Sequence, residues 1–160
     1  MKTSFIIVSL FFIFCLCGFS CQKEIMPPVT TTGAGTMGFK VDGVKWVAYS
    51  DDFKLPKTGA KYWTSYGLVI YGVSQKSHLD IILKNPKIGT YQFTSDDLIE
   101  YKLYNSATVF SLDLTDSSNI LKITRSDISV ISGTFSFKLK SSNGEIVSIT
   151  SGRFDISINP

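Results

Sequence analysis

The sequence is short of the side chains on which most enzymatic chemistry depends. Its 160 residues include a single histidine, His78. Nucleophilic catalysis pairs a histidine with a nucleophile and an orienting carboxylate, and neither Gly-x-Ser-x-Gly nor His-x-x-x-His occurs here. His78 alternates with the apolar Leu79 and Ile81, so we expect it on the exposed face of a strand. These absences favour a protein that is not an enzyme.

Cysteine and clustered charge are equally scarce. All three cysteines lie at or before Cys21, so the rest of the chain can form neither a disulfide nor a thiolate metal site. The 16 basic and 13 acidic residues form no basic stripe, which argues against nucleic acid as a partner. The pairs Asp51-Asp52 and Asp96-Asp97 lack the spacing of a calcium loop, and we expect both to be solvated loop acids. We therefore predict no metal and no cofactor.

The first twenty residues are unlike those that follow. Lys2 precedes an apolar run over residues 5–19, which is shorter than the roughly 20 residues of a membrane-spanning helix. A positive start followed by a short apolar run is typical of a secretory signal peptide. We predict that residues 1–20 are such a signal peptide.

A cysteine motif ends this leader. Residues 16–21, LCGFSC, resemble the lipobox of bacterial lipoproteins, which implies lipid attachment at Cys21 and anchoring to a membrane. Gln22, Lys23 and Glu24 resemble the short export signal of Bacteroidota lipoproteins. This resemblance implies lipid anchoring in the outer membrane, at the cell surface, with the periplasmic face as the alternative.

A linker composition follows. Residues 25–35, IMPPVTTTGAG, are rich in proline, threonine and glycine, so we predict an acylated N-terminus and flexible tether over residues 21–35 that places the domain away from the bilayer. Gly33, Gly35 and Gly38 form a literal G-x-G-x-x-G. No helix pattern follows these glycines, so a dinucleotide site is rejected.

From residue 36 onward the apolar period is two. Met37, Phe39 and Val41 alternate with polar positions, and a two-residue turn at Asp42-Gly43 would pair Phe39 with Trp46. Short alternating segments separated by turns predict one all-β domain over residues 36–160. We expect 8–10 short strands in an antiparallel β-sandwich, with a β-barrel as the alternative.

Individual strands can also be assigned. Residues 66–73 are apolar at nearly every position, which favours a strand covered on both faces. Residues 107–115 and 120–124 are expected to pair as a hairpin, and Tyr91 and Phe93 to form a short strand.

The last hairpin permits a finer prediction. A three-residue loop would pair Leu139 with Val147, with Gly144 in the left-handed region as a G1 bulge. The apolar parity changes again between Ile149 and Phe154, so Gly152 should mark a second bulge or a break.

The overall layout resembles a known family. The leader and lipobox, the hairpin FKVDGVKW, and the block ITRSD…ISGTFSFKL…NGEIVSITSGRFDI are similar to a Bacteroidota lipoprotein family of unknown function. The resemblance covers residues 36–158. It implies an all-β domain behind a lipobox and carries no activity.

Aromatic residues supply the remaining functional hint. Tyr62, Trp63 and Tyr66 are expected at the mouth of a loop over residues 50–60, and Tyr101 and Tyr104 in another irregular stretch. If these rings converge, they could stack on sugars or bury an apolar ligand; otherwise they cover the ends of the core. The sequence thus leaves two hypotheses, a surface ligand-binding or glycan-binding accessory module and a structural or protein-interaction component of the cell envelope.

Overall fold

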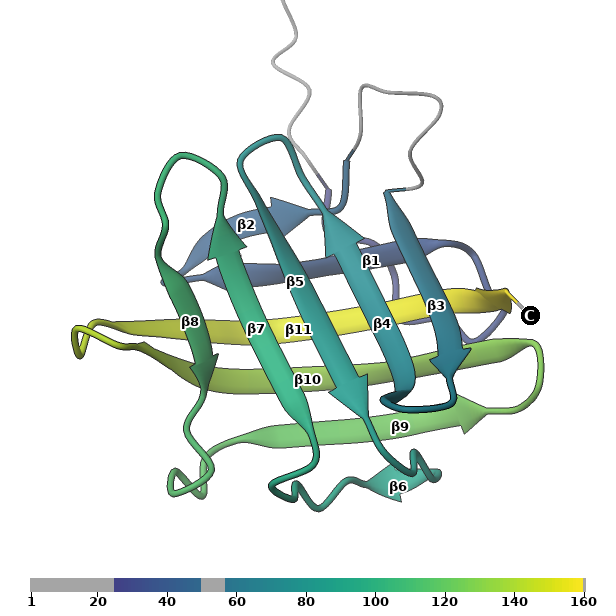
Figure 1. Ribbon diagram of the computed structural model, residues 1–160. Helices are drawn as coiled ribbons and strands as arrows, with labels where there is room; N and C mark the ends of the chain where they lie inside the picture. The colour runs from purple at the N-terminus through teal and green to yellow at the C-terminus, as the bar shows by residue number, and fades with distance from the viewer. Residues whose placement is uncertain (1–24, 50–56, 160) are drawn as a thin grey trace, which may run out of the picture.

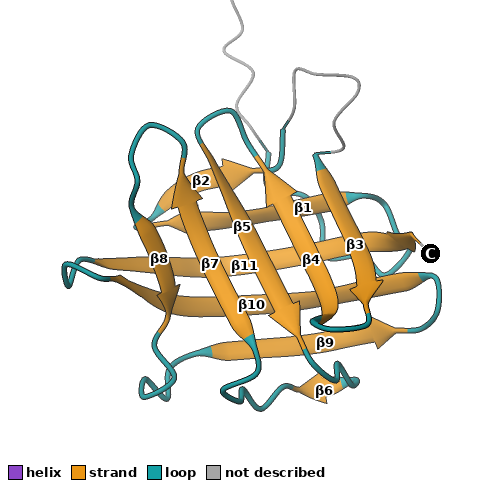
Figure 2. Cartoon of the chain, viewed as in Figure 1, coloured by secondary structure: helices purple, strands orange, loops and turns teal. Residues whose placement is uncertain are grey.

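The computed structural model describes residues 25–49 and 57–159. Every regular element within these ranges is a β-strand (Figures 1 and 2). The alternation of the sequence appears directly in the burial: along β5 (Ser77–Leu83) each buried residue is followed by a half-buried one. The all-β prediction is therefore confirmed, and its cause is the period of two in apolar residues.

The strands form two layers that face each other (Figure 1). The front layer consists of β3 (Thr58–Trp63), β4 (Gly67–Val73), β5, β7 (Leu98–Leu103) and β8 (Val109–Leu112). The back layer consists of β2 (Val44–Val47), β1 (Thr36–Val41), β11 (Ile146–Asn159), β10 (Val130–Ser141), β9 (Ile120–Ser126) and β6 (Gly89–Thr90).

The two layers belong to one mixed, hydrogen-bonded sheet. The end of β11 pairs in parallel with β3, where Ile158 lies opposite Ala60. The end of β10 pairs with β8, where Leu139 lies opposite Leu112. These two junctions and the β10–β11 pairing close a circuit of seven strands, β11-β3-β4-β5-β7-β8-β10, with β1, β2, β9 and β6 outside it.

The strands differ from those expected in number, in length and in the direction of one pairing. The described residues contain 11 strands, of which β10 and β11 have 12 and 14 residues. One pairing, β11 with β3, is parallel. A bulge adds one residue to a strand and so changes which residues face inward. One long strand can therefore continue where the change in the apolar pattern suggested a turn.

Aromatic rings form the centre of the core between the layers. Phe39 stacks on Trp46 with 4.2 Å between ring centroids. It also meets the edge of Tyr101 in the front layer at 6.2 Å and the ring of Phe135 at 5.8 Å. All four side chains are at most 7% exposed, so Phe39 connects the packing of the two layers.

Two of the three predicted hairpins, the first and the last, are confirmed. Phe39 lies opposite Trp46, and the positive φ values of Asp42 and Gly43 (48° and 84°) are those of a type I′ turn. In the last hairpin Leu139 lies opposite Val147, and Gly144 has φ of 90°, as a G1 bulge requires.

The second bulge also exists, one residue earlier than expected. Phe135 pairs with Gly152 and Phe137 with Ile149, so the register shifts between them. The positive φ, 54°, falls on Ser151 rather than on Gly152. Gly152 is required for a different reason: a Cβ there would lie 2.4 Å from ring atoms of Phe135.

This contact leads to a first prediction. We expect Gly152→Ala to lower the free energy of unfolding by about 1–3 kcal/mol, because the Phe135 ring and the bulge must move apart. Gly144→Ala is the matched control, since nothing lies within 4 Å of a Cβ at that position and only backbone strain of about 1 kcal/mol applies. Urea denaturation measures both, and a loss at Gly152 no greater than that at Gly144 would contradict the packing argument.

Two strand predictions are wrong. β4 alternates buried and half-buried residues, so it is covered on one face, not on both. Its outer positions nevertheless carry apolar side chains, among them Tyr71, whose ring covers Gly59 on β3. The short strand expected at Tyr91 and Phe93 contains neither residue, because β6 consists of Gly89 and Thr90, which pair with β9.

The hairpin expected between residues 107–115 and 120–124 does not form. β8 pairs with β7 and β10, whereas β9 pairs with β10 and β6. The connecting residues turn repeatedly: Asp113 accepts from the backbone N–H and hydroxyl of Thr115, and Asp116 does the same for Ser118. These Asx-type turns lead the chain from the front layer into the back layer.

Residues 25–35, which we call the strap, lie against the back layer instead of hanging free. Pro27 is buried, and a Cβ added to Gly38 on β1 would lie 2.6 Å from its Cδ. Arg153 donates to the Pro27 carbonyl at 3.1 Å, and Arg125 to the Thr31 carbonyl at 2.6 Å. The expectation of a flexible tether therefore fails for this part of the chain.

A buried carboxylate fastens the strap. Asp155 on β11 is 1% exposed. Its Oδ1 accepts from the Gly33 N–H and the Ser132 hydroxyl, both at 2.7 Å. Its Oδ2 accepts from the Thr30 hydroxyl at 2.6 Å and from the N–H and hydroxyl of Thr32 at 2.9 and 3.1 Å. Burial alone would raise the pKa of Asp155, but these hydrogen bonds outweigh it and hold the pKa well below its usual range.

Candidate functional site

The three aromatic residues singled out by the sequence share one hairpin. Tyr62 and Trp63 end β3, and Tyr66 occupies the turn before β4. They are 50%, 53% and 63% exposed. The turn closes through a hydrogen bond from the Tyr66 N–H to the Trp63 carbonyl at 3.2 Å, and Gly67 follows with φ of 89°. β3 begins at Thr58, so residues 58–60 of the expected loop belong to this strand. The rings lie at the end of β3 away from Lys57, and residues 50–56 lie outside the described residues.

The rings surround the hairpin end and do not form one flat surface. Neighbouring residues of a strand point to opposite faces, and Tyr62 shares the inner face of β3 with the buried Ala60. Trp63 shares the outer face with Lys61, whose Nζ lies 5.5 Å from the Trp63 ring centroid. A ligand would therefore meet rings on two sides of one projecting turn.

The other two tyrosines do not join them. Tyr101 lies within β7, is 5% exposed and belongs to the core. Tyr104 is 52% exposed but follows the opposite end of β7, where its ring lies 5.3 Å from that of His78. The register places Leu103 opposite Ser77 at one end of the front layer and Leu68 opposite Leu83 at the other. The aromatic residues thus divide between the two ends.

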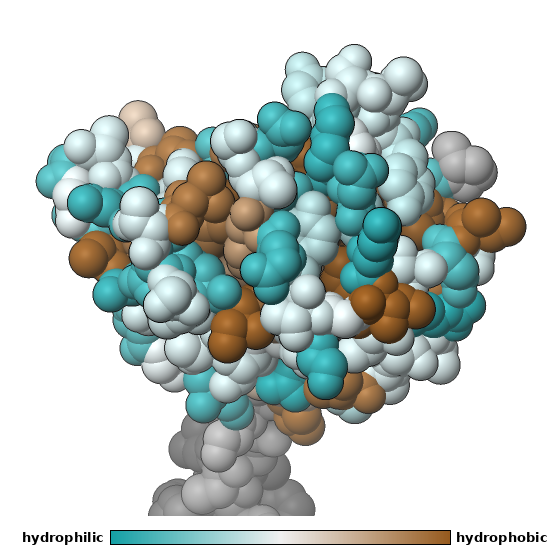
Figure 3. All heavy atoms as spheres, turned by 90° about the horizontal axis from the view of Figure 1, so that it is seen from below, coloured by the Kyte–Doolittle hydropathy of each residue, from teal (hydrophilic) through white to brown (hydrophobic). Residues whose placement is uncertain are grey.

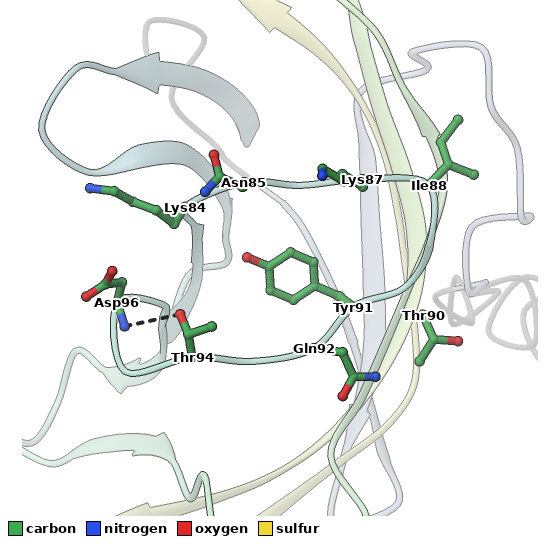
Figure 4. A pocket seen from close by; sticks show the side chains of 9 residues that line it. All are labelled: Lys84, Asn85, Lys87, Ile88, Thr90, Tyr91, Gln92, Thr94 and Asp96. Atoms are coloured by element: carbon green, nitrogen blue, oxygen red, sulfur yellow. Dashed lines mark hydrogen bonds between the residues drawn. The ribbon is translucent and has the colours of Figure 1, made fainter.

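A polar hollow lies beside the aromatic hairpin. The chain between β5 and β7 makes two arms around a hollow of about 420 Å³. In Figure 4 the ring of Tyr91 projects from one arm into the space between them. The lining is mostly of hydrogen-bonding side chains: Lys84, Asn85, Lys87, Ile88, Thr90, Tyr91, Gln92, Thr94 and Asp96.

One buried acid builds the hollow. Asp97 is 8% exposed and accepts from the Lys84 N–H at 2.9 Å, from the Tyr91 hydroxyl at 2.8 Å, and from the N–H and hydroxyl of Thr94 at 2.8 and 2.9 Å. It ties both arms to the start of β7. The expectation that Asp96 and Asp97 are both solvated is wrong for Asp97, because a carboxylate with four donors can be buried.

The Tyr91–Asp97 contact predicts a pH dependence. Burial, together with the hydrogen bond and charge of Asp97, raises the pKa of Tyr91 from 10.0 to about 12. A raised folded pKa favours the neutral phenol, so the stability it contributes is present below pH 10 and declines as the pH rises towards 12. The difference between the alkaline absorbance titrations of the wild type and Tyr91→Phe should contain one phenol with a midpoint near pH 12. A midpoint near pH 10 would contradict the contact.

The hollow and the hairpin occupy the same end of the molecule. Lys84, which lines the hollow, donates from Nζ to the Ser65 carbonyl within the aromatic turn at 3.2 Å. Figure 3 views the molecule from below, the end at which both elements lie in Figure 1, and shows separate hydrophobic groups between polar ones. The arrangement combines exposed rings with amide, hydroxyl and charged side chains, which suits a polar ligand that has apolar faces.

The single histidine lies near Tyr104, away from this end of the molecule. His78 is half-buried, not fully exposed as expected, and its Nε2 lies 3.3 Å from Asp80 Oδ2. Within residues 25–49 and 57–159 no group of three or more histidine, cysteine and acidic side chains could hold a metal ion. No helix that could cross a membrane occurs in those ranges either. Cys21, Gln22, Lys23 and Glu24, as well as Asp51-Asp52, lie outside the described residues.

The fold and the candidate site define a class of protein, an all-β domain whose exposed aromatic rings and polar hollow lie on turns and loops between strands. Comparison with known proteins narrows the class: residues 37–156 match the model of a domain of unknown function, DUF6252, and the chain belongs to that family. No curated protein and no solved structure matches the chain.

Proposed function

We propose that this protein is an exported lipoprotein, anchored through Cys21, whose aromatic hairpin and polar hollow bind carbohydrate. The observation that supports the proposal is the bond between Lys84 and Ser65, because it brings the exposed rings and the polar hollow into one continuous site. Sugars offer apolar ring faces for stacking and hydroxyl groups for amide and carboxyl partners. The proposed role is binding without a catalytic step.

The anchor and the strap together constrain where this site would lie. Pro27 is held on the back layer. Only five residues separate it from Cys21, so the distance between the two is at most about 22 Å. A lipid at Cys21 would therefore keep the domain close to the bilayer. The described chain begins at the top of Figure 1, whereas the aromatic hairpin lies at the bottom, so the proposed site would face away from the membrane.

Glycan binding tests the proposal directly. We expect the wild type to be retained on a glycan array or an insoluble polysaccharide, with Trp63→Ala and Tyr66→Ala each weakening binding about tenfold or more. Tyr104→Ala is the matched control, since its ring is equally exposed at the opposite end. Retention on no glycan, or an equal loss in the control, would refute carbohydrate binding by this end.

Anchoring is tested separately. Radiolabelled palmitate should be incorporated into the wild type and not into Cys21→Ser, which should leave the membrane fraction. We further propose outer-membrane display at the cell surface, on the resemblance of residues 22–24 to an export signal. Protease shaving of intact cells should then remove the domain; a domain protected until the outer membrane is opened would place it on the periplasmic side.

An exposed sheet edge favours a second candidate, a structural or protein-interaction role in the cell envelope. Among the described strands, β2 ends the strand order and pairs only with β1. The Ala48 N–H points towards β1, so that of Val47 points to the open edge, where an extended partner segment could add. Crosslinking in intact envelopes should then yield a stoichiometric partner that Val47→Pro loses; its absence would count against this role.

A further inference from the structure

A second hollow, of about 620 Å³, opens at the other end of the two layers. It lies between the β1–β2 hairpin and the ends of β5 and β7 that meet at Ser77 and Leu103. Its walls include Val41, Val44, Trp46 and Leu103. The size falls within the roughly 300–1,000 Å³ of small-molecule sites, and the walls are those of a site for an apolar group.

The polar atoms at the base of this hollow are already satisfied. Ser77 is 2% exposed, and its hydroxyl oxygen accepts from Trp46 Nε1 at 2.9 Å and from the Tyr101 hydroxyl at 3.0 Å. A hydroxyl has two acceptor sites and one hydrogen, and the Ser74 hydroxyl lies 3.3 Å away to receive that hydrogen. An apolar ligand would therefore leave none of these groups without a partner, which removes the usual cost of covering polar atoms.

The rim of the hollow is positively charged. Lys45 and Lys76 line it and are exposed. Asp42 also lines the hollow, and its Oδ1 accepts the Ser148 N–H at 2.9 Å. The formal charges of these three side chains still sum to a positive value, because two lysines face one aspartate. Two ammonium groups beside an apolar hollow complement a ligand with an apolar body and an anionic head.

We propose that this hollow binds a fatty acid, with its acyl chain between Trp46, Val44 and Leu103 and its carboxylate at Lys45 and Lys76. The inference uses none of the residues of the carbohydrate proposal and stands at the opposite end of the domain. Each could fail without the other.

The two tryptophans of the sequence make the test specific. Trp63→Phe leaves Trp46, in the wall of the hollow, as the sole indole. Dodecanoate, titrated below its critical micelle concentration, should change the tryptophan fluorescence of this variant until it saturates. Dodecyltrimethylammonium should bind at least about tenfold more weakly than dodecanoate. Lys45→Glu and Lys76→Glu should each weaken dodecanoate binding about fivefold, the factor expected from one surface charge pair.

Further variants separate specific binding from adsorption. Val44→Glu places a charge at the mouth of the hollow on a side chain that is 71% exposed, so it should block binding while leaving the melting temperature unchanged. Lys122→Glu, an exposed lysine on β9, should leave binding unchanged. The proposal is overturned if Trp63→Phe melts normally but shows no saturable change, if the cationic amphiphile binds equally well, or if Val44→Glu binds like its parent. Binding of lysophosphatidylglycerol ten times tighter than dodecanoate would replace the fatty acid by a membrane lipid.

Discussion

Replacing Asp155 by asparagine should destabilise the domain by about 3 kcal/mol. Both carboxylate oxygens accept hydrogen bonds, including those from the backbone N–H groups of Thr32 and Gly33. An amide retains one acceptor oxygen and turns an NH₂ group towards the other donors, so at least one buried N–H loses its partner. Thermal or urea unfolding of residues 25–160 measures the loss, which corresponds to roughly 10 °C in melting temperature.

The matched control is Asp113→Asn. Asp113 also accepts a backbone N–H and a hydroxyl, both from Thr115, but it lies on an exposed turn. Water replaces lost hydrogen bonds there, so we expect little change. Equal effects at Asp113 and Asp155 would show that the strap is not fastened as described.

Asp155→Asn should also change how the stability of the domain depends on acid pH. Because the folded pKa of Asp155 lies below its ordinary value of 3.8, the carboxylate contributes its full stability above about pH 5. That contribution declines as the pH falls below 4 towards the folded pKa. The stability difference between wild type and Asp155→Asn should therefore be constant near neutrality and shrink in acid; a difference that grows in acid would contradict the assignment.

Removing the strap should have the largest effect of all. The family match begins at residue 37, and a chain cut there would lack every strap contact. We expect residues 36–160 to be about 3–5 kcal/mol less stable than residues 25–160, since the five hydrogen bonds from the strap to Asp155 and the packing of Pro27 on Gly38 are lost together. Circular dichroism during urea unfolding compares the two chains.

A double-mutant cycle makes this prediction specific. If the strap acts through Asp155, Asp155→Asn should cost much less in the shortened chain than in the longer one, because most of the donors are already gone. Additive losses would mean that the strap stabilises the sheet elsewhere, for instance through Pro27 over Gly38. A shortened chain as stable as the longer one would refute the docking of the strap.

The sequence predicted those features that neighbouring residues decide. Two turns could be predicted, at Asp42-Gly43 and at Gly144. In each hairpin only one loop length pairs the apolar residues of the two strands with each other, because a register slip of one residue exposes a whole apolar face. For Tyr62, Trp63 and Tyr66 the sequence left open whether the rings are exposed or cover the core, and the structure leaves all three at least 50% exposed. Tyr101 belongs to a regular strand, and the sequence carries the signal for it, because Ile99, Tyr101 and Leu103 alternate with two charged residues.

The hollow beside the hairpin was missed because a single acid organises it. Asp96 and Asp97 look alike in the sequence, and only the arms brought together by Tyr91 and Thr94 determine that Asp97 is the buried one. The available signal was weak: a threonine three residues before an aspartate is a common turn pattern.

The amino-acid sequence by itself thus determined that this protein is built of strands, which side chains face inward, and where its tightest turns lie, because these follow from a period of two and from local turn chemistry. Tertiary structure alone decided that β11 meets β3, that β8 and β9 separate into different layers, and that Asp155 holds the strap. Each of these joins residues far apart in the chain, and the free energy of such contacts depends on a burial that exists only after the two layers have come together.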